Sequence, residues 1–231
     1  MPRGLSNNEN SGKTYVSCAN GVFIQRMSEA TKDTIERELT KGPNAGTMVN
    51  ELHFQRIEGQ LVKAEKRTHE EYGTSWNFTI DVSQTPEEKE ELILGVKGSY
   101  AKQILMRLPN ADLKHDIVLT SYCFTPTGES KERKGISMSQ GMGKVMPAYT
   151  KDEPNGLPEM THVMLKGKKV WDDHAQVLFL EAMMDSDIIP QLRDSKPAEE
   201  APTSAERIER FEENEEPSEQ PKAAKSDKLP F

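Results

Sequence analysis

The sequence predicts a mainly β fold with one main helix, arranged as a small antiparallel barrel and followed by a disordered tail. Two observations support the barrel. A long extended stretch at 48–62 contains a glycine and returns as a strongly alternating strand at 75–82. The other apolar runs are short and are separated by Gly, Pro and Asn turns, with no strand-helix alternation and no internal repeat. The acidic, proline-rich composition from residue 190 onward predicts the tail.

The N-terminal elements are short. Residues 1–13 are polar and predict a disordered arm. Strands are expected at 15–18 and 21–27, because Asn20-Gly21 supplies the positive φ angles of a tight hairpin turn. Residues 28–40 are charged and predict only a weak helix.

The central hairpin is the most informative segment. Gly59 lies inside the outgoing stretch and predicts a bulge or bend, which a sheet needs in order to curl. On the returning strand Trp76, Phe78, Ile80 and Val82 share one face, while polar residues occupy the other. This alternation predicts a half-buried strand and favours core packing over base stacking for Trp76.

The main helix is expected to begin at Thr85-Pro86, a capping residue followed by a proline suited to the first turn. Leu92, Val96, Tyr100 and Ile104 follow at i,i+4 intervals. Glycines at 95 and 98 weaken the middle, so a helix followed by an extended segment is an alternative. Further strands are expected at the segments 116–124, 135–140, 161–170 and 175–184.

This order of elements predicts one domain at 14–189. Strands, a curled hairpin, a helix and further strands are typical of the OB-fold, a small antiparallel barrel with a helix over one end. An open α+β sandwich would give much the same pattern.

Charge and cysteine content restrict the function classes. The tail at 190–231 holds eleven acidic and seven basic residues, a net charge of −4, and leaves −4 of the whole chain's −8 for residues 1–189. The body therefore lacks the basic balance of a duplex-binding domain, although single-strand binders manage with a local groove. Cys18 and Cys123 show no metal-ligand spacing and are expected to be free thiols in the cytoplasm. No apolar run is long enough to span a bilayer.

Catalytic motifs are absent from the sequence. Gly141-Met142-Gly143-Lys144 has the wrong spacing for a phosphate-binding loop, and no serine lies in a nucleophile elbow. Asp172-Asp173-His174 is the one local group that resembles metal ligands, and three adjacent residues rarely point at one ion. We expect no enzyme activity and no cofactor; a metal-dependent nuclease at this triplet is the third alternative.

Three patches combine cations with nearby aromatic residues, as sequence-tolerant binding of single strands requires. The first lies on the long hairpin, the second follows the strand at 116–124, and the third lies near 170. Tyr122 and Phe124 alternate with Leu119, Ser121 and Cys123, so one of these two faces of the strand is core, and the sequence leaves open which. The predicted DNA-binding residues are Lys63, Lys66, Arg67, Trp76, Tyr122, Phe124, Lys131, Arg133, Lys134, Tyr149, Lys168, Lys169 and Trp171.

The tail resembles the C-terminal tail of bacterial and phage single-stranded DNA-binding proteins, in which an acidic segment finishes in an aliphatic residue, Pro and Phe. The matching residues are Asp227, Leu229, Pro230 and Phe231, whereas Lys228 stands where that family has an acidic residue. The resemblance implies single-stranded DNA binding in replication or recombination and recruitment of partner proteins through these four residues. The main alternative is an acidic structural or scaffolding protein that mediates protein assembly without nucleic acid.

Overall fold

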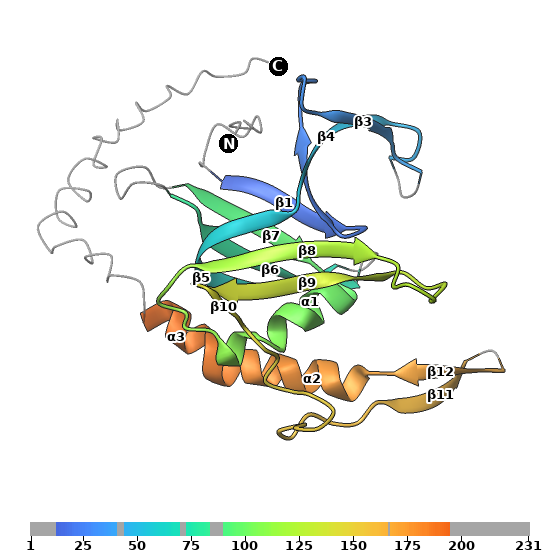
Figure 1. The fold of residues 1–231 in the computed structure, drawn as a ribbon, viewed down its shortest axis with the longest axis vertical. Coiled ribbons are helices and arrows are strands. Elements are labelled where there is room, and N and C mark those ends of the chain that lie inside the picture. Colours follow the sequence, from blue (N-terminus) through green and yellow to red (C-terminus); the bar gives the residue numbers. More distant parts are fainter. Residues whose placement is uncertain (1–12, 41–43, 70–72, 84–89, 166, 195–231) are drawn as a thin grey trace, which may run out of the picture. The chain divides into compact units, whose positions relative to one another are not determined.

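A mixed β-sheet forms the centre of the computed structural model, which describes residues 13–40, 44–69, 73–83, 90–165 and 167–194. Ten of the described strands follow the order β10-β9-β8-β5-β6-β7-β1-β2-β4-β3, and β11 and β12 form a separate hairpin (Figure 1). The pair β1 and β7 is parallel, and the other pairs are antiparallel.

The strand bounds show how far the mainly β prediction holds. The strands are β1 (Lys13–Ala19), β2 (Val22–Met27), β3 (Ile35–Glu38), β4 (Met48–Phe54), β5 (Arg56–His69), β6 (Gly73–Asp81), β7 (Glu91–Val96), β8 (Ile117–Phe124), β9 (Arg133–Gln140), β10 (Gly143–Lys144), β11 (Thr161–Leu165) and β12 (Lys168–Asp172). The fold is mainly β, as predicted. The prediction of a closed barrel is wrong. Strands β10 and β3 lie at the two edges, so the described strands form an open sheet.

Strand β5 joins the two halves of the sheet. Residues Arg56 to Gly59 pair with β8, and the ladder with β6 begins at Gln60. At the changeover Gly59 approaches the backbone of Asp81, and a bulge lies between Leu61 and Lys63. The predicted irregularity inside this strand is confirmed, although the bulge lies two to four residues after Gly59; Gly59 itself marks the change of partner strand and closes no barrel.

The N-terminal hairpin is confirmed. Asn20 and Gly21 have φ angles of 50° and 73°, the left-handed values that a two-residue turn between antiparallel strands requires. The weak helix expected at 28–40 is wrong, since β3 occupies part of that segment and pairs with β4. All four residues of β3 are exposed, so backbone pairing rather than an apolar face decides their conformation.

The sequence predicted only part of the helical structure: Tyr100 and Ile104 of the expected main helix are helical, whereas the helices from His174 onward were not expected. The helices are α1 (Gly98–Leu105), η1 (Leu108–Asn110), α2 (His174–Met183), the π-helical turn η2 (Met184–Ile188) and α3 (Ile189–Asp194). The main helix expected from Thr85 is wrong over 91–96, which forms β7 between β6 and β1; residues 84–89 lie outside the described part. The strand expected at 175–184 is wrong because that segment is helical. The hairpin β11–β12 replaces the single strand expected at 161–170.

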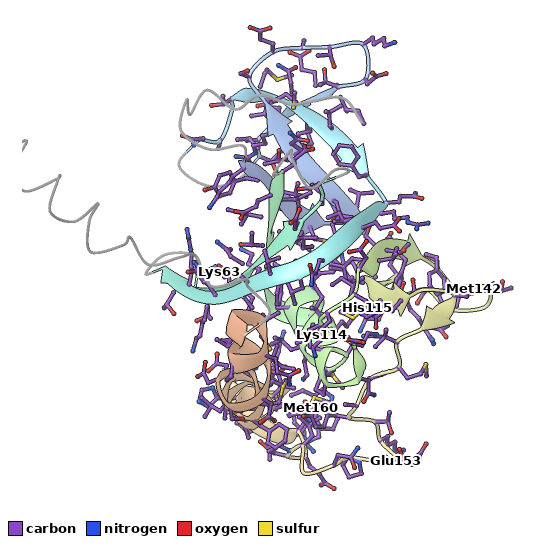
Figure 2. The ribbon with its side chains drawn as sticks, turned by 90° about the vertical axis from the view of Figure 1, so that its left-hand side faces the viewer. Lys63, Lys114, His115, Met142, Glu153 and Met160 are labelled. Carbon is purple, nitrogen blue, oxygen red and sulfur yellow. The ribbon has the colours of Figure 1, made fainter. Side chains whose placement is uncertain are left out.

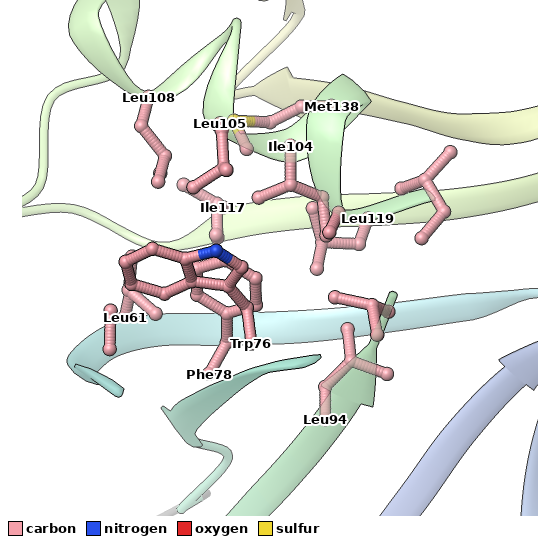
Figure 3. Close-up of a cluster of buried hydrophobic side chains, with 14 of the residues drawn as sticks. Leu61, Trp76, Phe78, Leu94, Ile104, Leu105, Leu108, Ile117, Leu119 and Met138 are labelled. Carbon is pink, nitrogen blue, oxygen red and sulfur yellow. The ribbon is translucent and has the colours of Figure 1, made fainter. Parts of the chain in front are cut away.

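The hydrophobic core lies between the sheet and the helical layer, which covers one face (Figure 1). Figure 3 shows side chains of β5, β6 and β7 below those of α1, with Trp76 over Phe78. These two rings are stacked with centroids 6.2 Å apart, and both are buried. The inward face predicted for β6 is confirmed by Trp76, Phe78 and Ile80.

The domain boundaries differ slightly from those expected. Strand β1 begins at Lys13, which the sequence assigned to the N-terminal arm, and α3 continues past residue 189 to Asp194. Residues 1–12 and the tail from 195 lie outside the described part. None of the described helices is long and apolar enough to cross a membrane.

Candidate nucleic-acid interface

The first cationic patch borders a groove between β5 and the C-terminal helices. Lys63, Lys66 and Arg67 line this groove of about 520 Å³ together with Trp76 and residues of η2 and α3. Figure 2 shows Lys63 on β5 where the strand passes the helices. The structure therefore brings together four of the residues that the sequence predicted to bind DNA.

Carboxylates neutralise the cations of this groove. The Lys63 ammonium lies 2.5 Å from Glu65 Oε1, and the Lys66 ammonium lies 2.8 Å from Glu181 Oε2. Arg67 contacts Glu65 at 3.7 Å, and the ion pair with Lys63 is the main reason that the pKa of the Glu65 carboxyl is lowered. Because every cation of the groove has an acidic partner, the groove offers little net attraction to phosphates.

Two of the predicted stacking residues belong to the core. Trp76 is 4% exposed, and Tyr149 is 8% exposed and packs edge-on against Phe179 with ring centroids 5.4 Å apart. A base can stack only on a ring with a free face, so neither ring contributes to a surface interface in this conformation. Burial also raises the pKa of the Tyr149 phenol.

The second patch lies at the open end of the β8–β9 pair and keeps an exposed aromatic ring. Phe124 is 52% exposed, and its centroid lies 5.9 Å from that of half-buried Tyr122. The inward residues of β8 are Ile117, Leu119 and Ser121. Tyr122 and Phe124 therefore share the other face of the strand, away from the main core, and this answers the question of orientation that the sequence left open.

A glutamine positions this end of β8–β9 against α1. The Gln103 Oε1 atom accepts hydrogen bonds from the Ile136 backbone N–H at 2.8 Å and from the Tyr122 hydroxyl at 3.4 Å. The glutamine occupies the space beside Gly135 that a Cβ atom would fill. The Tyr122 hydroxyl is thus already engaged, which leaves Phe124 as the free ring.

The cations of the second patch differ in their pairing. Arg133 binds Glu129 through both its Nε, at 3.2 Å, and its terminal nitrogen. Lys131 and Lys134 are exposed, and neither has an ion-pair partner among the described residues. These two lysines are therefore the cations of this patch that can attract phosphate without first breaking an ion pair.

The third patch occupies the β11–β12 hairpin. Trp171 is 61% exposed, and its ring centroid lies 3.5 Å from that of His162 on the opposite strand. Lys168 and Lys169 are exposed and have no ion-pair partner in the described part of the chain. His162 is a site residue that sequence reasoning missed, since only the register that pairs it with Trp171 places the two rings together.

The triplet considered as a metal site serves the start of α2. Asp172 Oδ1 accepts a hydrogen bond from the His174 backbone N–H at 3.0 Å, and Asp173 Oδ2 accepts one from the Lys102 ammonium at 3.0 Å. Within the described residues, no three His, Cys, Asp or Glu side chains are grouped so as to hold a metal ion.

The patches divide into two regions. In Figure 1 the β8–β9 and β11–β12 ends extend to the right of α1, whereas α3, which borders the groove with β5, lies on the left. The predicted partner-binding residues Asp227, Leu229, Pro230 and Phe231 lie outside the described residues.

Comparisons with family models, curated proteins and solved structures found no match to this chain.

Proposed function

We propose that this chain is a non-enzymatic, sequence-tolerant single-stranded DNA-binding protein that acts in replication or recombination. One observation carries the proposal: the exposed ring of Trp171 shares a face of the β11–β12 hairpin with Lys169, which has no acidic partner among the described residues. The exposed ring of Phe124 lies at the β8–β9 end that also carries Lys131 and Lys134, two further lysines without such a partner in the described part. Splayed bases of a single strand stack on exposed rings, while the adjacent phosphates bind mobile cations. Both hairpins that carry these groups extend past α1 to the same side (Figure 1).

The charge of the chain limits how strongly it binds DNA. The net charge of −8 provides no long-range attraction, and the cations of the β5 groove are already neutralised. Binding therefore depends on a few local contacts and on stacking. Because the described sheet is open, these contacts lie on two hairpins rather than in the groove of an OB-fold barrel.

The acidic tail is part of the proposal. Residues 190–231 carry a net charge of −4 and include the segment Asp227 to Phe231 that resembles the partner-binding tails of single-stranded DNA-binding proteins. We assign Asp227, Leu229, Pro230 and Phe231 to the recruitment of replication or recombination proteins. The segment combines three apolar side chains with the carboxylate of Asp227, which suits a pocket that is both apolar and basic.

Fluorescence anisotropy with a labelled thymine oligonucleotide, measured across a salt series, tests the DNA-binding proposal. We expect binding at low salt, weaker binding at higher salt and preference over a duplex of equal length. The double variant K131A/K134A should flatten the slope of log affinity against log salt by about 0.7 for each phosphate that it no longer neutralises. The variant K32A/K114A removes the same charge from exposed lysines elsewhere and should leave the slope unchanged. Absence of binding at low salt, or equal affinity for duplex, would refute the proposal.

A scaffolding protein is the second candidate, and a specific observation favours it. Exposed apolar side chains gather around β11, β12 and the first turns of α2, including Met164, Val177 and Leu178. Concentrated apolar surface of this kind is typical of protein interfaces. Concentration-dependent self-association without oligonucleotide binding would favour this function over the first.

A further inference from the structure

The register of the β11–β12 hairpin separates its side chains into two chemically different faces. Directly opposed residues of an antiparallel pair project to the same side, and neighbours along a strand project to opposite sides. His162 is opposite Trp171, and Met164 is opposite Lys169, so these four residues share one face, which we call the ring face. The pairs Thr161–Asp172 and Val163–Val170 lie on the other face.

The ring face combines what an unpaired nucleotide requires. Trp171 and His162 provide π surface, Met164 is 68% exposed beside them, and Lys169 is the charged group of the face. None of these four residues is a carboxylate, whereas Asp172 lies on the other face. Lys169 and Trp171 are two residues apart on one strand, so their Cα atoms are separated by about 7 Å. A lysine at that distance can reach the phosphate next to a base stacked on the indole.

The root of the hairpin is held by side chains of α1 and α2. Buried Gln176 donates a hydrogen bond to the Pro158 carbonyl at 2.7 Å and accepts one from the Lys102 ammonium at 2.5 Å. Lys102 also bonds Asp173, the residue that directly follows β12. The hairpin is therefore anchored at both of its ends, which limits the entropy lost when a ligand settles on the ring face.

We propose that the ring face is a stacking platform for an unpaired nucleobase, with Trp171 and His162 beneath the base and Lys169 holding its phosphate. The proposal rests on the proposed single-strand function and specifies which side of the hairpin performs it. The charge of the ring face favours a nucleic-acid ligand over an apolar protein partner. Lys169 has no acidic partner in the described residues, and the ring face carries no carboxylate that would repel a phosphate.

Adjacent lysines on opposite faces give a matched test. Lys168 is opposite Leu165 and Lys169 is opposite Met164, so K168A and K169A remove the same charge from the two sides of one hairpin. With a labelled thymine oligonucleotide we expect K169A to raise Kd by about 5- to 10-fold and K168A by less than about twofold. K169A alone should also flatten the salt dependence. Equal effects of the two variants would overturn the proposal, because a diffuse charge effect does not depend on the face.

Trp171 gives an independent readout of stacking. The chain has two tryptophans, of which Trp76 is buried, so oligonucleotide should quench Trp171 emission in the wild type and leave the emission of W171F nearly unchanged. W171A should raise Kd by about 5- to 150-fold, as loss of one stacked base predicts. M142A, at another exposed apolar site, serves as the control, with circular dichroism to verify folding.

The outcomes separate this proposal from the broader one. Wild-type binding to oligo-dT with unchanged affinity in W171A and K169A would overturn the ring-face platform and leave single-strand binding intact. Failure of the wild type to bind either oligo-dT or oligo-U would overturn both. If W171A lost binding of a protein in pull-down experiments while oligonucleotide affinity stayed unchanged, the ring face would be a protein-docking surface instead.

Discussion

Arg37 holds the buried carboxylate of Glu51 through two hydrogen bonds, Nε to Oε2 at 3.1 Å and a terminal nitrogen to Oε1 at 2.6 Å. Glu51 is only 1% exposed and also accepts a bond from His53 Nε2 at 3.1 Å. Arg37 belongs to β3, whose four residues are all exposed, and Glu51 belongs to β4. This ion pair therefore anchors an edge strand that has no buried apolar side chain.

Replacing Arg37 by methionine should destabilise the protein, because it leaves a buried carboxylate with one hydrogen-bond partner. We expect a loss of about 1–3 kcal/mol in the free energy of unfolding at neutral pH, measured by urea denaturation. R56M is the control: Arg56 pairs with Glu58 at 2.6 Å with both side chains exposed, and its loss should cost under about 1 kcal/mol. Equal losses in the two variants would mean that burial of Glu51 adds nothing to the pair.

The Glu51 carboxylate should also make the free energy of unfolding depend on pH in the acidic range. The hydrogen bond from Arg37 is the main reason that the pKa of the Glu51 carboxyl is lowered in the folded protein. A carboxyl with a lowered folded-state pKa contributes stability above its unfolded pKa of about 4.3, and the contribution disappears as pH falls through the folded value. The stability difference between wild type and E51Q should therefore be constant near neutral pH and shrink in acid. A difference that grew on acidification would contradict the assigned direction.

Gly59 should tolerate no side chain. A Cβ atom there would contact the Asp81 carbonyl oxygen and lie 2.9 Å from Ile80 Cγ2, at the point where β5 changes its partner strand. Since backbone atoms cannot yield easily, G59A should lower the unfolding free energy by about 1–3 kcal/mol. G143A is the control because its Cβ would meet only Gln140 O, at 3.7 Å. Calorimetric melting of both variants measures the difference; a G59A midpoint as high as that of G143A would show that β5 can shift.

Local patterns predicted the elements in which one signal was unambiguous. The alternation from Trp76 to Ile80 is correct because Trp76, Phe78 and Ile80 on one face of β6 are all buried, whereas on the other face Ser75 and Asn77 are half-buried and Thr79 alone is buried. The segment 91–96 was misread because Leu92 and Val96 satisfy both a helical i,i+4 spacing and a strand spacing through Leu94. Strand β7 lies inside the sheet and has buried residues on both faces. It therefore lacks the apolar–polar alternation that would have distinguished a strand from a helix.

The C-terminal helix was missed for a related reason. Val177 to Leu180 is a short apolar run that suits a strand, and the pattern of buried residues, Leu180, Met183, Met184 and Ile188, appears only when the helix packs on the sheet. The candidate site shows the same limit. Its cationic patches are contiguous in sequence and were found, whereas the pairing of Lys66 with Glu181 and of His162 with Trp171 depends on tertiary structure and register.

The two cysteines should differ sharply in reactivity towards a thiol reagent. Both are free thiols; Cys123 is exposed on β8, whereas burial raises the pKa of the Cys18 thiol to about 12. Because the thiolate is the nucleophile, Cys18 remains almost entirely unreactive at mildly alkaline pH. In the native protein we expect one rapid and one slow phase of modification, with the rapid phase absent from C123S and retained in C18S. Unfolding in denaturant should make both thiols react rapidly, since the raised pKa depends on burial. A rapid phase that persisted in native C123S would show that the Cys18 thiol is accessible and that the β1–β2 hairpin opens on the timescale of the reaction.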